Sequence, residues 1–127
     1  MPDYAHILDL TETLRRDAPA LEAAAEFRAL YRSGGIAELK SSRRPGAANL
    51  LARYGEARVH QLFKTIDELY DMLWHLNPRR VLSLGHGPGP SLSEEADLAL
   101  RLLEVFVPGI PEGLRRILES QFMFDNR

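Results

Sequence analysis

Hydrophobic residues along this chain recur mainly at steps of three and four, the spacing that places side chains on one face of an α-helix. The longest such stripe lies between residues 56 and 76, and Asn77 and Pro78 end it because the residue before proline disfavours helix. A stripe this wide predicts the central helix of a bundle, although the same heptad spacing also suits a dimer seam. Its members are Val59, Leu62, Ile66, Leu69, Leu73 and Leu76, widened by Phe63 and Tyr70.

Shorter patterns predict helices before this central element. Segments 4–16 and 20–33 each carry a one-sided apolar set, and Asp17 between them is a residue type that caps helix starts. Residues 36–42 predict one or two helical turns. We expect "RRPGAAN" to break the chain before a short helix that Gly55 kinks or stops.

Two more helices are predicted after the central one. Ser91 or Ser93 can cap a helix running through "EEADLALRLLEVFV", and Glu94 stands three residues after Ser91, the capping-box spacing. "PGIP" then breaks the chain before a last amphipathic helix, and we expect "MFDNR" to form a loose tail. The apolar face of that last helix comprises Leu114, Ile117, Leu118 and Phe122.

These patterns predict an all-α fold, a small bundle of about five to six helices with a Gly/Pro-rich connection before the two C-terminal helices. We interpret 1–127 as a single helical domain, with a core over 1–78, a connector over 79–92 and a C-terminal hairpin over 93–127. The length of 127 residues and the apolar fraction of 45% agree with one ordinary globular domain.

The composition and motifs of the chain exclude several kinds of functional site. The chain has no cysteine, which excludes disulfides, thiolate metal sites and cysteine catalysis. No histidine pairs with another at helical ligand spacing, and no recognised nucleophile or phosphate-binding motif occurs, so we predict no metal, no catalytic residue and no cofactor. Because the first residues lack a basic region before an apolar run and no stretch approaches a membrane span, we expect a cytoplasmic location.

One glycine-rich stretch, residues 81–89 or "VLSLGHGPG", resembles the first motif of class I S-adenosylmethionine-dependent methyltransferases. The resemblance implies a strand entering a glycine turn whose backbone amides approach the cofactor. However, Ser83 stands where that motif has an acidic residue, and only 38 residues follow Gly89, too few for the family's sheet. The alternating glycine and proline residues favour a hinge or strap, with a small S-adenosylmethionine-binding enzyme or fragment as an alternative. The matching positions are Val81, Leu82, Leu84, Gly85, Gly87, Pro88 and Gly89.

A basic segment spans residues 40–58, in which Glu56 is the one acid among five cations. Arginine forks match phosphate oxygens and carboxylates, so this segment supports a nucleic-acid-binding subunit as an alternative function. The formal net charge of −2 weakens that reading, since dedicated nucleic-acid binders usually carry a positive excess. The five cations are Lys40, Arg43, Arg44, Arg53 and Arg58.

The absence of a convergent polar site, together with several amphipathic helices, favours a non-catalytic helical interaction protein. We interpret it as an accessory or scaffolding subunit of a larger complex, or as a homo-oligomer. A peripheral membrane contact through the C-terminal helix is an open alternative. The candidate partner-binding residues are Tyr70, Trp74, Phe122 and Phe124 as apolar anchors and Arg43, Arg44, Arg79 and Arg80 as a polar rim.

Overall fold

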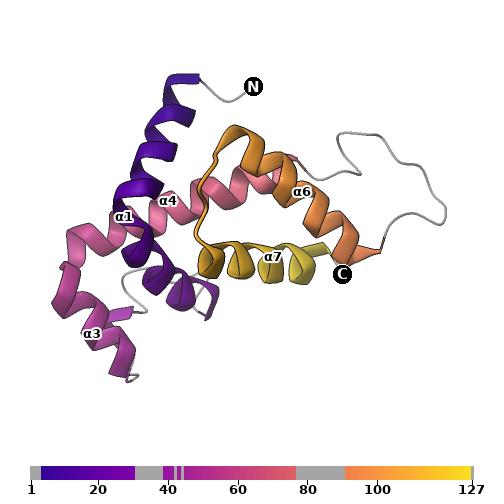
Figure 1. Ribbon diagram of the computed structural model, residues 1–127. Coiled ribbons are helices and arrows are strands. Elements are labelled where there is room, and N and C mark those ends of the chain that lie inside the picture. Colours follow the sequence, from indigo (N-terminus) through magenta and orange to yellow (C-terminus); the bar gives the residue numbers. More distant parts are fainter. Residues whose placement is uncertain (1–3, 31–38, 42, 44, 77–90, 127) are drawn as a thin grey trace.

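The fold is all-α, as the hydrophobic pattern predicts, and a computed structural model describes residues 4–30, 39–41, 43, 45–76 and 91–126 (Figure 1). Within these ranges there is no strand, and residues 39–41 are also helical. The prediction of a small helical bundle is confirmed. The helices are α1 (Tyr4–Leu30), α3 (Pro45–Tyr54), α4 (Glu56–His75), α6 (Leu92–Phe106) and α7 (Glu112–Asn126).

Helix α4 lies at the centre and packs against α1, α3, α6 and α7. Its predicted stripe is buried almost throughout, so this heptad spacing forms the chain's own core. Figure 1 shows α1 crossing α4 on one side while α6 and α7 form a helical hairpin on the other. The α4 residues buried in the core are Val59, Leu62, Phe63, Ile66, Leu69 and Leu73.

Helix α1 contains the boundary that the sequence predicts between two helices. Asp17 has non-helical backbone angles of φ −111° and ψ 18°, so two helical segments meet there at a kink within the span Tyr4–Leu30. Its carboxylate is only 6% exposed and accepts hydrogen bonds from Arg58 of α4 and from Arg16. Asp17 therefore serves as a buried partner for arginine side chains, and it makes no cap hydrogen bond to the described backbone.

Helix ends confirm one prediction and correct two others. The Ser91 hydroxyl accepts a hydrogen bond from the Glu94 amide at 3.2 Å, which is the predicted cap of α6. The expected break at "RRPGAAN" is wrong in part, because α3 begins at Pro45; proline is well tolerated in a first helical turn, where its missing N–H costs no hydrogen bond. The expected loose tail is also wrong, because α7 continues to Asn126.

The α6–α7 hairpin is held by an arginine as well as by its core. The Arg115 guanidinium lies 2.7 Å from a Glu104 carboxylate oxygen and 3.4 Å from an Asp97 oxygen. The hydrogen bond to Glu104 raises the pKa of Arg115 above its ordinary value, with Asp97 adding to the same effect and partial burial opposing it. Three charged side chains thus fix the α7 start against α6.

No helix in the described part of the chain is long and apolar enough to cross a membrane.

Candidate functional site

Helix α6 is apolar on two adjacent sides, and the chain buries only one of them. The inner side comprises Ala96, Ala99, Leu100 and Leu103, all fully buried against the rest of the bundle. The second side carries Leu98, Leu102, Val105 and Phe106. At about 3.6 residues per turn these four positions fall within an arc of about 100°. We call them the outer face of α6.

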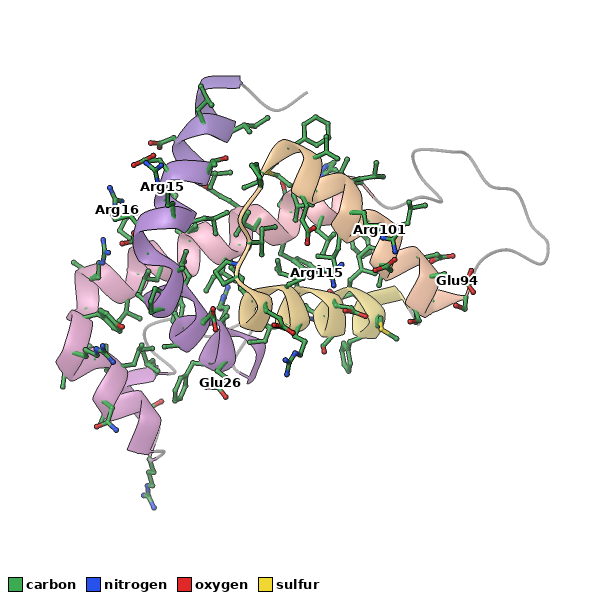
Figure 2. All side chains as sticks on the ribbon, in the orientation of Figure 1. Arg15, Arg16, Glu26, Glu94, Arg101 and Arg115 are labelled. Atoms are coloured by element: carbon green, nitrogen blue, oxygen red, sulfur yellow. The ribbon has the colours of Figure 1, made fainter. Side chains whose placement is uncertain are left out.

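The outer face is open to solvent. Val105 is 76% exposed, Phe106 and Leu98 are exposed to 41% and 39%, and Leu102 is half-buried. An isolated exposed leucine is ordinary on a protein surface, but a row of four apolar side chains on one helix marks an interaction site more often than chance. Figure 2 shows α6 on the periphery of the bundle, where it packs mainly against α7 and α4.

Part of the polar side of α6 is engaged within the chain. Arg101 pairs with Asp97 at 2.9 Å one turn earlier on the helix. Asp97 and Glu104 also hold Arg115 of α7, as described above. Asp97 and Glu104 are therefore engaged within the hairpin, and the apolar outer face is the candidate surface of α6 for a partner.

Among the predicted anchors, Tyr70 and Phe122 are engaged within the fold. The Tyr70 hydroxyl donates to the Asp125 carboxylate and thereby ties α4 to α7. Phe122 is 0% exposed and is among the largest fully buried side chains. It packs in the chain's own core, because the apolar side of α7 faces inward at that position, so its side chain is not accessible to a partner in this structure.

The other two predicted anchors are accessible. Phe124 is 56% exposed near the end of α7, and Trp74 is half-buried near the end of α4. Of the predicted polar rim, Arg43 is exposed. Arg44, Arg79 and Arg80 lie outside the residues whose side chains the structure describes, so they are not placed relative to these aromatic residues.

The basic segment does not form a uniform positive surface. Lys40 pairs with Glu56 at 2.9 Å, and Arg58 pairs with Asp17. Arg53 lies over the ring of Tyr54, 5.4 Å from its centroid. Two of the four described cations of this segment are thus neutralised locally, which reduces the field available to a nucleic-acid phosphate.

The glycine stretch 81–89 lies outside the described residues. The structure therefore does not test its resemblance to a cofactor-binding turn.

The outer face of α6 is a candidate surface that is missed when each helix is assigned one apolar face. The run "LALRLLEVFV" at 98–107 holds eight apolar residues in ten positions, more than one buried helix face uses. This high number of apolar residues is the sequence signal that predicts a second apolar face on the helix. No family model, curated protein or solved structure matches this chain, so the functional argument depends on the geometry alone.

Proposed function

We propose that this protein is a non-catalytic helical interaction protein that binds its partner through the outer face of α6. The observation that supports the proposal is the second apolar side of this helix, with Val105 at 76% exposure. Burying an apolar side chain gains about 1.5–3 kcal/mol. Association of this face with another apolar surface would recover most of that free energy for Val105 and a part of it for Leu98, Leu102 and Phe106, which are already partly buried.

The spacing of the outer face suits a second copy of the same helix. Leu98, Leu102 and Phe106 stand at equal steps of four, so the row is symmetric about Leu102. In a two-fold antiparallel pair, residue i meets residue j and residue j meets residue i. Leu98 of one copy would then meet Phe106 of the other, and the two Leu102 side chains would meet on the axis.

The charges beside the outer face do not decide this pairing. In the same antiparallel arrangement Arg101 of one copy lies within one residue of the level of Glu104 of the other, but also within two residues of the level of the other Arg101. The apolar row therefore carries the argument for this register. A single helix pair buries less than a standard interface of roughly 1,600 Å², so we expect a weak dimer, with a dissociation constant on the order of micromolar or higher.

Sedimentation equilibrium tests the proposal when the protein is examined from about 5 to about 500 µM, the range in which weak interfaces populate a dimer. We expect the wild-type mass to rise with concentration and Val105→Glu to remain monomeric. The matched control is Leu8→Glu, which changes an exposed apolar residue of α1 and should self-associate as the wild type does.

Two other outcomes are informative. A wild-type chain that stays monomeric, yet captures a protein whose binding is lost in Val105→Glu and kept in Leu8→Glu, would support the interaction surface with a different partner. If association, or capture of a partner, responds equally to both substitutions, the outer face of α6 is not the binding surface.

A further inference from the structure

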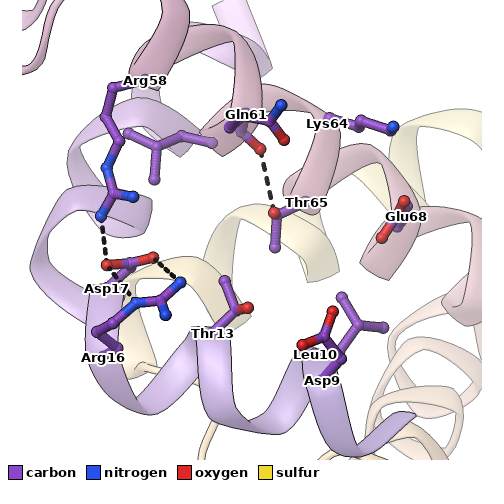
Figure 3. A pocket seen from close by; sticks show the side chains of 11 residues that line it. Asp9, Leu10, Thr13, Arg16, Asp17, Arg58, Gln61, Lys64, Thr65 and Glu68 are labelled. Carbon is purple, nitrogen blue, oxygen red and sulfur yellow. Dashed lines mark hydrogen bonds and ion pairs between the residues drawn. The ribbon is translucent and has the colours of Figure 1, made fainter. Parts of the chain in front are cut away.

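A polar groove of about 360 Å³ lies between α1 and α4 on the side of the bundle shown in Figure 3. Helices of a bundle ordinarily meet along apolar side chains. Here Leu10 and Leu62 alone are apolar among the residues that line the groove, and none of those residues belongs to α6. A ligand of this groove would therefore bind independently of the proposed contact through the outer face of α6.

One end of this groove combines two arginines with a single carboxylate. The buried Asp17 carboxylate lies between Arg58, which approaches it through Nη2, and Arg16, whose Nε and Nη2 each lie 3.4 Å from one of its oxygens. Two guanidinium groups and one carboxylate leave one positive charge in excess. This end of the groove therefore suits a monoanion.

Both arginines keep hydrogen-bond donors for such an anion. Within the described part of the chain, Asp17 is the one acid that pairs with either of them, so Nη1 of each guanidinium and Nε of Arg58 remain available. The Arg16 side chain is 64% exposed and its contacts are long. It can therefore turn toward a ligand without losing a strong hydrogen bond.

Uncharged polar side chains continue the groove beyond the arginines. Thr13 and Thr65 face each other across it, with Gln61 beside Thr65 (Figure 3). The Thr65 hydroxyl donates to the Gln61 backbone carbonyl at 3.1 Å, so its oxygen remains as an acceptor. Among the residues that the structure describes, none forms a hydrogen bond with the Thr13 hydroxyl or the Gln61 side-chain amide. These groups can therefore both donate to and accept from hydroxyl groups of a ligand.

We infer that this groove binds a small hydroxylated monocarboxylate. Arg16 and Arg58 would hold the carboxylate, because guanidinium forks match its two oxygens. Thr13, Gln61 and Thr65 would bind the hydroxyl groups. A volume of about 360 Å³ is within the range of small-molecule sites. An apolar carboxylate would displace water from the polar side chains without replacing its hydrogen bonds, and an uncharged polyol would leave the excess positive charge uncompensated.

The test compares three probes of equal chain length: gluconate, hexanoate and sorbitol. Chemical shifts of the α1 and α4 amides are followed by NMR as each probe is titrated into the full chain. We expect saturable shifts with gluconate at roughly millimolar concentration and at least about tenfold weaker binding of the other two probes, each of which lacks one kind of contact. The proposal is overturned if gluconate gives no saturable shift, or if hexanoate, sorbitol or inorganic phosphate binds as tightly.

Adjacent arginines provide a matched pair of variants. Arg16→Gln removes a guanidinium from the groove, and we expect it to weaken gluconate binding about tenfold. Arg15→Gln removes a guanidinium that pairs with Glu12 on the exposed side of the same helix, and binding should be unchanged. Equal effects of Arg15→Gln and Arg16→Gln would show nonspecific charge binding and contradict the site. Thr13→Val should weaken gluconate binding severalfold, and unchanged binding would contradict recognition of the hydroxyl groups.

Discussion

Asp17 connects the kink of α1 to α4, and replacing it with alanine tests how much this contact stabilises the bundle. A hydrogen bond to a charged group is worth about 1.5–3 kcal/mol. The Arg16 contacts, at 3.4 Å, lie beyond the usual range and add little. Removing one partner of a fully buried ion pair costs about 3–5 kcal/mol. The cost here should be lower, because Arg58 is 43% exposed and water can solvate its guanidinium once the Asp17 carboxylate is gone.

We therefore expect Asp17→Ala to lower the free energy of unfolding by about 1.5–3 kcal/mol, the contribution of the Arg58 contact alone. For a chain of this length the melting temperature should fall by roughly 5–15 °C. Urea denaturation followed by circular dichroism measures the first quantity, and calorimetry measures the second.

Two controls make this prediction specific. Glu12→Ala removes an exposed ion pair with Arg15 on the same helix and should cost less than about 0.5 kcal/mol. A double-mutant cycle of Asp17→Ala with Arg58→Ala should give a coupling energy of about 1 kcal/mol or more. A coupling energy of zero, or an equal loss of stability in Glu12→Ala, would refute the assignment of Asp17 as a tie between α1 and α4.

Two further substitutions test the packing of the bundle by urea denaturation. Phe122→Ala should lower the free energy of unfolding by about 3–5 kcal/mol, because it opens a cavity at a fully buried position; a loss below about 1 kcal/mol would place the ring at the surface. Gly55→Ala should cost about 1–3 kcal/mol through backbone strain alone, since Gly55 has φ +82° and ψ 159° but open space around it; an unchanged stability would contradict that backbone conformation.

Much of the fold follows from periodicity. The α4 stripe combines a regular spacing with a proline just beyond its end, so local pattern and tertiary packing agree. Ser91 and Glu94 similarly form a cap whose geometry depends on neighbouring residues only. Where an element is determined locally, the sequence predicts it well.

The predictions from sequence differ from the structure where a tertiary contact overrides a local sequence preference. Asp17 reads as a cap because aspartate prefers helix starts, but Arg58, 41 positions later, draws its carboxylate into the bundle. The end of α7 reads as a tail, but Phe122 packs in the core and Asp125 contacts Tyr70. None of these partners is visible in a local window of sequence.

The candidate binding surfaces are also predicted poorly wherever they depend on tertiary packing. Aromatic residues such as Phe122 and Tyr70 attract attention in a sequence, yet the fold uses both internally. The outer face of α6 can be recognised only after the inner, buried face has been identified in the structure, because the segment "LALRLLEVFV" is apolar on both faces.

Cysteine cross-linking tests the proposed α6 interface most directly, since the chain contains no cysteine of its own. Leu102→Cys places one thiol on the proposed two-fold axis, where the Cα atoms of the two copies approach the separation of about 4.4–6.8 Å that a disulfide needs. We predict that mild oxidation of Leu102→Cys yields a covalent dimer, whereas the exposed control Leu8→Cys stays largely monomeric. Equal cross-linking of the two variants, or none in Leu102→Cys, would contradict an interface centred on the outer face of α6.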